Sequence, residues 1–320
     1  MTPPNAPATH PATARPPAGQ PLAALNAAAE QLWLRLNAIL EAHQSGDDPA
    51  GSQRNGISME VLASIDSTNT ELMRRARAGQ CDPVLLLATE QTAGRGRMGK
   101  TWLSEPGACL MFSLGLPMQP AHWAGLSLAV GVSLADTLAS TLPAAIAPRL
   151  QLKWPNDLWL CGAKLAGILV ETAHVGTRPY VVVGVGINIT PPPPEALARL
   201  TAQASSATAG SRAAPAMTAT PPTGLAAHAP ELDAAQVWQH VAPALLGDLL
   251  AFEALGFSAF AQRFARRDAL HGLPLRLSDG TEGTGCGVDD DGALLLLTAQ
   301  GMRSVHSNEV SVRPQGDSPC

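Results

Sequence analysis

The sequence has few cysteines, and they form no pattern. Five occur in 320 residues, at positions 81, 109, 161, 286 and 320, without a C-x-x-C pair. This spacing excludes a dense disulfide framework and the usual zinc-ligand sets. Isolated thiols are typical of the reducing cytoplasm, where we expect the protein to reside.

Long apolar runs and an excess of positive charge are also missing. No stretch approaches the roughly 18 apolar residues of a membrane-spanning helix. The N-terminal segment carries Arg15 but no apolar h-region, which excludes a signal peptide. The 21 Lys+Arg against 26 Asp+Glu give a net charge of −5, so no general attraction to nucleic acid or anionic membranes is expected. The composition favours a soluble intracellular protein without a membrane partner.

Proline and glycine, in contrast, are plentiful, with 28 and 29 residues. Residues 1–21 are rich in Pro, Ala and Thr and predict a disordered tail, and residues 45–56 predict a linker. Between them, apolar residues at helical spacing predict one helix over residues 22–43. Residues 190–230 predict a low-complexity insert of high mobility. Residues 1–56 should therefore hold a tail, one helix and a linker ahead of the folded body.

The body alternates between strand and helix patterns. Thr68 and Glu71 predict a capping box at the start of its first helix. From Pro274 to Val312, short strands are separated by glycine-containing turns about ten residues apart, which predicts a small β-barrel of about five strands. Strands are predicted at 57–65, 84–88, 108–116, 150–154, 157–171 and 180–189, and helices at 68–78, 121–142, 233–254 and 257–267.

The stretch of greatest chemical interest is the loop over residues 89–102. It places Arg95, Arg97 and Lys100 among three glycines, with Trp102 directly after them. Glycine allows close approach of a ligand to the backbone, guanidinium groups suit carboxylate and phosphate oxygens, and an indole suits a nucleobase. The loop therefore predicts capture of an anionic, nucleotide-like ligand, and a solvated basic surface loop is the alternative.

Residues 94–101 also match the P-loop pattern G-x-x-x-x-G-K-[ST]. That motif needs a helix directly after the loop, so that the helix N-terminus faces the phosphates. Here residues 101–105 run into Pro106 and Gly107, which leaves no room for such a helix. We therefore interpret the match as coincidental.

Other polar residues allow two interpretations each. Ser67, Thr68 and Asn69 fit helix capping, and they also fit ligand binding beside the cationic loop. Lys164 fits protection of a strand edge. The two glycines at 184 and 186, within an otherwise apolar strand, indicate close approach of another group.

Taken together, these segments resemble the biotin–protein ligase family in order and spacing over about residues 60–190. The residues that carry the resemblance are Ser67-Thr68-Asn69, Gln91, Gly94 to Gly99, Trp102, Lys153 to Asp157, Lys164 to Glu171, and Gly184 to Asn188. The resemblance implies an α+β fold, with a mixed-sheet catalytic domain of the biotin/lipoate ligase type over residues 57–267. It also implies an SH3-like β-barrel over residues 268–315.

The resemblance implies a two-step reaction. Biotin and ATP, with Mg²⁺, would give biotinyl-5′-AMP, and a lysine of the biotin carboxyl carrier protein of acetyl-CoA carboxylase would then receive the biotin. Arg95 and Arg97 would hold the biotin carboxylate and the adenylate phosphate, and Lys164 would act where these groups meet. The other implied contacts are Ser67, Thr68, Asn69 and Gln91 with biotin, the backbones of Gly96 and Gly167 nearby, Trp102 over the adenine, Asn156 and Asp157 on the phosphate and Mg²⁺ side, Asn188 at the ribose, and Arg313 near the nucleotide.

Several alternatives stay open from the sequence. A lipoate–protein ligase shares the implied fold and adenylate chemistry, but would lack the Gly-Arg-Gly-Arg-x-Gly signature. Some biotin ligases also repress biotin synthesis through an N-terminal winged helix, whereas residues 1–56 predict one helix without a basic recognition face. We therefore expect no DNA binding. A homodimer formed through exposed strand edges is possible in this fold.

Overall fold

The computed structural model describes residues 20–44, 56–102, 107–175, 178–193, 222–306 and 312–314. The predicted tail, most of the linker, and residues 194–221 of the predicted insert lie outside these ranges. Within them, no helix is both long enough and apolar enough to span a membrane.

The body is built on a seven-stranded sheet with the order β1-β2-β3-β7-β6-β5-β4. Strands β1 and β2 are parallel and all other neighbours are antiparallel, so the predicted mixed sheet is confirmed. The strand bounds are β1 (Ser58–Leu62), β2 (Val84–Ala88), β3 (Cys109–Pro117), β4 (Leu150–Lys153), β5 (Asp157–Leu160), β6 (Ala163–Val175) and β7 (Arg178–Asn188).

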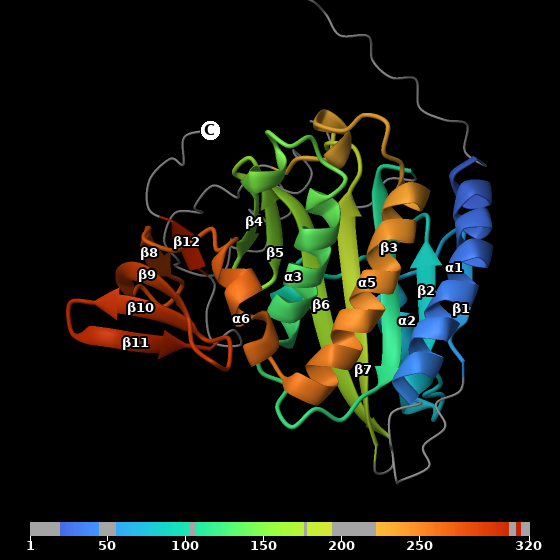
Figure 1. Cartoon of the computed structure of the whole chain (residues 1–320), viewed down its shortest axis with the longest axis horizontal. Helices are drawn as coiled ribbons and strands as arrows, with labels where there is room; N and C mark the ends of the chain where they lie inside the picture. The colour runs from blue at the N-terminus through green and yellow to red at the C-terminus, as the bar shows by residue number, and fades with distance from the viewer. Residues whose placement is uncertain are drawn as a thin grey trace, which may run out of the picture.

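Helices cover both faces of this sheet (Figure 1). One face is covered by α1 (Gln20–Gln44), α3 (Leu126–Ala139) and α5 (Ala234–Leu255), and α6 (Ser258–Ala265) packs against α3 and α5. The opposite face carries α2 (Thr68–Arg77). Short 3₁₀ turns occupy Arg97–Gly99, Ala147–Arg149 and Leu225–Ala227.

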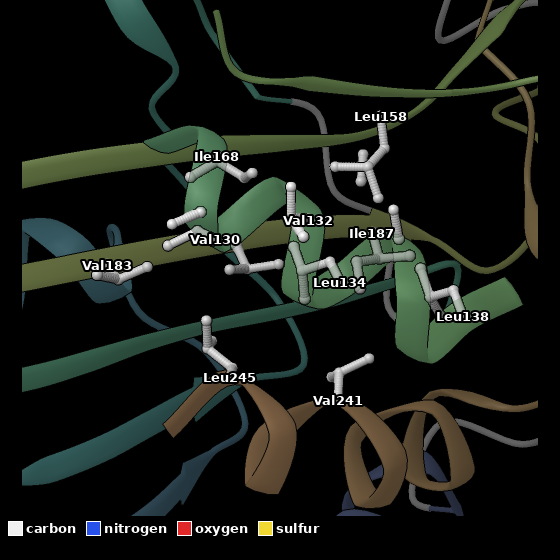
Figure 2. Close-up of a cluster of buried hydrophobic side chains, with 14 of the residues drawn as sticks. Val130, Val132, Leu134, Leu138, Leu158, Ile168, Val183, Ile187, Val241 and Leu245 are labelled. Atoms are coloured by element: carbon white, nitrogen blue, oxygen red, sulfur yellow. The ribbon is translucent and has the colours of Figure 1, made fainter. Parts of the chain in front are cut away.

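Two hydrophobic clusters follow from this arrangement. In β2, Leu85 and Leu87 join the larger cluster, and Val84 and Leu86 join the smaller one under α2. Because both faces of the strand are covered, its sequence is apolar without alternation. Figure 2 shows the centre of the larger cluster, where α3 and α5 pack beside each other on the sheet and bury residues such as Leu134 and Leu245.

Helix α1 belongs to the larger cluster. It contacts β1 and α5, and its fully buried side chains are Leu25, Ala28, Leu32, Leu36 and Leu40. The predicted helix is confirmed. The apolar residues at helical spacing are Leu25, Ala29, Leu32, Leu36 and Ile39, and of these Ala29 and Ile39 are only half-buried, so the buried stripe is rotated slightly.

One predicted helix cap and one predicted helix start were wrong, although α2 begins at Thr68 as predicted. The cap of α2 is Ser67, whose side chain accepts from the Thr70 backbone N–H at 3.4 Å, and not Thr68. Helix α3 begins at Leu126 rather than at residue 121, because Gly125 precedes it in the left-handed conformation with φ 76°. A side chain at Gly125 would also overlap Phe257.

The C-terminal strands form a second, five-stranded antiparallel sheet with the order β11-β10-β9-β8-β12. Its strands are β8 (Pro274–Leu277), β9 (Glu282–Val288), β10 (Leu294–Thr298), β11 (Gly301–Val305) and β12 (Val312–Pro314). The predicted strand number is confirmed. Among the described residues, β11 and β12 stay at opposite edges, so no strand pairing closes the sheet into a barrel.

The second sheet is joined to the first at β4. Leu152 N–H donates to Arg267 C=O at 2.7 Å, and Ala269 N–H donates back to Leu152 C=O at 2.9 Å. The buried Trp154 indole donates to the Gly292 carbonyl, in the β9–β10 turn, at 3.0 Å. The turn is therefore held directly against the residue that precedes Pro155 and Asn156.

Candidate functional site

A pocket lies on the face of the sheet that carries α2. It is lined by every candidate site residue with a described side chain except Asn188, and also by Lys100, Lys153, Gly184, Gly186 and Val312. Val312 comes from β12, so the C-terminal sheet contributes to the pocket wall. The side chain of the neighbouring Arg313 lies outside the described part of the structure.

Three glycines form the floor of the pocket. Gly184 and Gly186 alternate along β7 and therefore face the same side, and Gly167 pairs with Gly186 across β6. A Cβ at Gly186 would lie 2.6 Å from Trp102 Cε2, and one at Gly184 would overlap Asn69 Oδ1. The glycines are therefore required because Trp102 and Asn69 lie directly on the sheet surface, which confirms the predicted close approach.

The start of α2 forms one polar wall. Ser67, Thr68 and Asn69 are all buried, although they stand at a helix terminus. Ser113 of β3 lies beneath them, with its hydroxyl 2.7 Å from Thr68 Oγ1 and 2.6 Å from Asn69 Oδ1. Buried polar groups without partners are costly, and these contacts keep the wall fixed.

Gln91 completes this wall from the loop that follows β2. Its Oε1 accepts from the Thr68 backbone N–H at 2.8 Å and lies 3.2 Å from Thr68 Oγ1. An isolated β-bridge between Ile65 and Gln91 sets the height of the side chain. The wall therefore offers hydroxyl and amide groups at fixed positions to a neutral polar ligand.

The Gly/Arg loop is a short hairpin. Arg95 and Thr101 form an antiparallel bridge, and Gly96 N–H donates to Lys100 C=O at 2.7 Å. Met98, at the tip, has φ 55° and an exposed side chain. The chain thus turns back on itself after the glycines, where a P-loop would begin a helix, and the coincidental reading of that motif is supported.

Arg95 and Arg97 reach into the pocket from this hairpin with different partners. Arg95 Nη2 donates to Glu171 Oε1 at 2.9 Å, and Nη1 donates to Thr70 Oγ1 at 3.2 Å. Arg97 Nη1 donates to Asn156 Oδ1 at 3.3 Å. Burial lowers the pKa of Arg97, and the charge of Asp157 opposes that shift. Arginine stays charged even so, which leaves a half-buried cation facing the pocket.

Lys164 reaches the pocket from β6, whereas Arg95 and Arg97 reach it from the Gly/Arg hairpin. Its Nζ lies 2.8 Å from Asp157 Oδ1 and 5.7 Å from the centre of the Trp102 ring. Asp157 and Lys164 come from β5 and β6, which form a hairpin with a register shift between Leu158 and Trp159. Because Lys164 lies in the pocket beside a carboxylate and an indole, its predicted placement in the site is supported over a role in edge protection alone.

Asn188 is the predicted residue that the pocket does not include. It lies one alternation beyond Gly186 on β7, is buried, and donates to the Lys164 backbone carbonyl at 3.4 Å. The Cys109 thiol donates to its Oδ1 at 3.5 Å. In this position Asn188 supports the backbone of Lys164.

Asp157 is the candidate for the predicted metal. It supplies one carboxylate, which is paired with Lys164. Among the described residues, no group of three His, Cys, Asp or Glu side chains could hold an ion. A hard cation with one protein carboxylate and phosphate oxygens from a nucleotide is nevertheless a usual arrangement for Mg²⁺, so the residues fit a metal that arrives with its ligand.

Two residues that the sequence analysis did not single out belong to the site. Ser113 and Glu171 both contact Asn69, at 2.6 Å and 3.0 Å. Counting by two along β6 from Gly167 reaches Leu169 and then Glu171, so strand alternation could have placed Glu171 on the pocket face. Ser113 gave no comparable signal in an apolar strand.

Comparison with known proteins gives consistent matches. Residues 61–188 match the model of the Biotin/lipoate A/B protein ligase family, and residues 275–313 match the Biotin protein ligase C terminal domain. The chain is 33% identical over 261 residues to a biotin--[acetyl-CoA-carboxylase] ligase from Paracoccus denitrificans. This match covers 78% of this chain and 98% of the relative.

A second ligase of that name, from Mycobacterium tuberculosis, is 40% identical over 168 residues, which are 50% of this chain and 60% of the relative. Two bifunctional ligase/repressors, from Salmonella typhimurium and Escherichia coli, are matched over 44% and 42% of their own length. The chain thus spans about half the length of several curated relatives that it matches.

Among solved structures, a biotin protein ligase from Aquifex aeolicus in complex with biotin and ATP is similar. The TM-score is 0.61 at 25% identity, and the match covers 81% of this chain and 99% of the other.

Proposed function

Because this chain belongs to the biotin–protein ligase family, we propose that it activates biotin with ATP and attaches it to a lysine of the biotin carboxyl carrier protein of acetyl-CoA carboxylase. The observation that carries the proposal is the convergence of Arg95, Arg97 and Lys164 on one pocket with a glycine floor. The names of the Paracoccus and Mycobacterium relatives support the carboxylase substrate.

In the first step, a biotin carboxylate oxygen attacks the α-phosphorus of ATP. A P–O bond forms, the bond to the β-phosphate breaks, and pyrophosphate leaves. The reaction brings an anion onto a polyanion, so positioned cations stabilise its transition state. Arg95 and Arg97 hold the carboxylate and the α-phosphate, and Lys164 stabilises the charge where they meet. The guanidinium and ammonium groups neutralise this charge without competing with the biotin carboxylate as nucleophiles, because they are protonated.

The polar wall suits the biotin end of the ligand. Ser67, Thr68, Asn69 and Gln91 would hydrogen-bond the ureido ring, which has both N–H donors and a carbonyl acceptor. Both amide hydrogens of Asn69 have protein acceptors, Leu169 C=O at 3.1 Å and Glu171 Oε2 at 3.0 Å. Asn69 would therefore serve the ligand through Oδ1.

Trp102 and the phosphate side suit the nucleotide. The indole lies directly against Gly186 and Gly167, and it would stack on adenine. Asn156 would bind phosphate, and Asp157 would hold a Mg²⁺ ion, which when bound neutralises phosphate charge. Asn188 would act on the ribose side only through the Lys164 backbone that it supports.

In the second step, the ε-amine of the carrier lysine attacks the carbonyl carbon of biotinyl-AMP. An amide forms, the bond from that carbon to the phosphate oxygen breaks, AMP leaves, and the amine loses a proton. Until then the mixed anhydride must be kept from water. The 94–102 hairpin, which carries two of the cations, is placed to cover it.

The test uses the purified full chain with ATP, biotin and a purified carrier domain, and detects transferred biotin with streptavidin. A parallel reaction without carrier measures biotinyl-AMP and pyrophosphate, and lipoate replaces biotin in a third. Biotin-dependent adenylate and labelled carrier are expected. Lipoyl adenylate without biotinyl adenylate would point to a lipoate ligase, and failure to form either would reject the proposal.

Three further expectations belong to this proposal. We expect no binding to a biotin operator, and we expect that a homodimer would form through exposed strand edges. The reducing cytoplasm suits the thiols of Cys81, Cys109, Cys161 and Cys286, which form no disulfide among the described residues. Because some relatives are named ligase/repressors, a gel shift at low salt with biotin and ATP is the direct check. Biotin-dependent retardation of operator DNA would assign a bifunctional ligase/repressor.

A further inference from the structure

Glu171 contacts Arg95 and Asn69, two residues that line a pocket that we assign to anions. It is a carboxylate at the pocket edge, and its side chain is only 21% exposed. Its two oxygens have different partners: Oε1 accepts from Arg95 Nη2 at 2.9 Å and Oε2 accepts from Asn69 Nδ2 at 3.0 Å. A carboxylate beside an anion site weakens binding unless it serves another purpose.

We infer that Glu171 is a positioning residue that joins the Gly/Arg hairpin to the polar wall and orients Arg95 for the ligand. The inference rests on the proposed function. Arg95 is held on one side by Glu171 and on the other by Thr70 Oγ1 at 3.2 Å. A guanidinium has five N–H donors, so with one from each Nη engaged, the others still point toward an incoming carboxylate or phosphate.

In this arrangement Glu171 is the fixed group, and Arg95 and Asn69 are the groups that it positions. Glu171 stands on β6, where it pairs with Val182 of β7, so its backbone is fixed by the sheet. Arg95 stands on a hairpin held at its base by single backbone bonds such as Trp102 N–H to Gly94 C=O at 2.9 Å. Asn69 lies on α2, against Gly184. One carboxylate thus sets two ligand-binding groups from different elements at a constant separation.

Glutamine at this position removes the charge and leaves one acceptor oxygen. In Glu171→Gln the amide oxygen can accept from Arg95 or from Asn69 but not from both, and the ion pair with Arg95 is lost. In Glu171→Ala both contacts are lost. The matched control is Glu60→Gln, which removes another partly exposed Glu–Arg pair, with Arg75, outside the pocket.

The first measurement is independent of catalysis. Trypsin cleaves after Arg95 only when the hairpin opens locally and that side chain is released. In the full-length protein without ligand, Glu171→Gln should raise the rate of cleavage after Arg95, followed by mass spectrometry, about two- to fivefold, the range expected for a partly exposed ion pair. Glu60→Gln should leave this rate unchanged. Equal rates in the wild type and Glu171→Gln would overturn the inference.

The second measurement follows biotinyl-AMP in single turnover. Glu171→Gln should release adenylate several times faster with a nearly unchanged KM for biotin, whereas Glu171→Ala should also raise that KM. Adding Glu171→Gln to Arg95→Ala should change little, because the residue acts through Arg95. Full additivity would overturn the positioning role. If the wild type makes no adenylate, the proposed function fails, and the proteolysis comparison still decides the inference.

Discussion

The two glycines of β7 allow the two ends of the pocket to be perturbed separately. Neither residue has a positive φ, so alanine can adopt the backbone conformation at both positions and its cost is steric. In Gly186→Ala the new Cβ would lie 2.6 Å from Trp102 Cε2 and 2.7 Å from Cζ2. In Gly184→Ala it would overlap Asn69 Oδ1. The indole and the amide would each have to leave the floor.

The expected losses differ in kind. Stacking of a base on an aromatic ring is worth about 1–3 kcal/mol, so Gly186→Ala should raise the KM for ATP about 5- to 150-fold and that for biotin much less. Displacing Asn69 disturbs its contacts with Ser113, Leu169 and Glu171, each worth about 1 kcal/mol. Gly184→Ala should therefore raise the KM for biotin at least about tenfold.

Pyrophosphate release measures both constants, with Gly115→Ala as the control. A side chain at Gly115 would overlap the Tyr180 hydroxyl on the same sheet face, outside the pocket. This variant should lower the melting temperature without a selective change in either KM. Trp102→Ala should abolish the extra effect of Gly186→Ala on ATP, because the clash is removed. A full penalty in the double variant, or equal effects of the two glycine variants on both substrates, would refute the reasoning.

Four other substitutions test separate contacts. Lys164→Ala should slow pyrophosphate release by at least about 2 kcal/mol of transition-state stabilisation, and near-normal release would reject its role. Arg97→Ala should increase escape of free biotinyl-AMP, so unchanged retention in single turnover would contradict the assignment. Trp154→Phe removes the hydrogen bond to the β9–β10 turn and should lower stability by about 0.5–1.5 kcal/mol more than Trp238→Phe. The Trp238 indole N–H has no hydrogen-bond partner within the part of the chain that the structure describes. Equal unfolding free energies of the two variants would argue against the Trp154 bond. Burial raises the pKa of Asp268. The stabilising contribution of its protonated form is therefore complete below the ordinary aspartate pKa and is lost as pH rises through the folded value. The melting temperature of Asp268→Asn should exceed that of the wild type by an amount that grows from about pH 3.5 to pH 8, and a constant difference would exclude this ionisation.

Much of the fold could be predicted because the spacing of apolar residues along the chain indicates where strands and helices lie. The fully apolar β2 and β3 and the alternating β1 were located to within a few residues. Helix starts were less accurate, since Ser67 and Thr68 are equivalent caps in sequence, and only the buried contacts of Thr68 with Ser113 and Gln91 distinguish them.

Relations between distant segments carried no comparable signal. Trp154 and Gly292 are 138 positions apart, and their bond depends on how the second sheet meets β4. The pairing of Arg95 with Glu171 needs the strand order that places β6 beside the pocket. The sequence therefore indicated which residues gather, and could not indicate which of them hold one another.

The Ser113 hydroxyl has a further consequence. It carries a single hydrogen and lies within bonding distance of both Thr68 and Asn69, so only one of them can receive it at a time. With the hydrogen toward Asn69, Thr68 must supply the hydrogen of its own 2.7 Å contact with Ser113 and cannot donate it to Gln91 Oε1. With the hydrogen toward Thr68, the Thr68 hydroxyl can donate to Gln91 Oε1 at 3.2 Å, and Asn69 Oδ1 no longer accepts from Ser113. Rotation of one O–H bond thus changes which oxygen of the wall accepts from the protein, without moving a heavy atom.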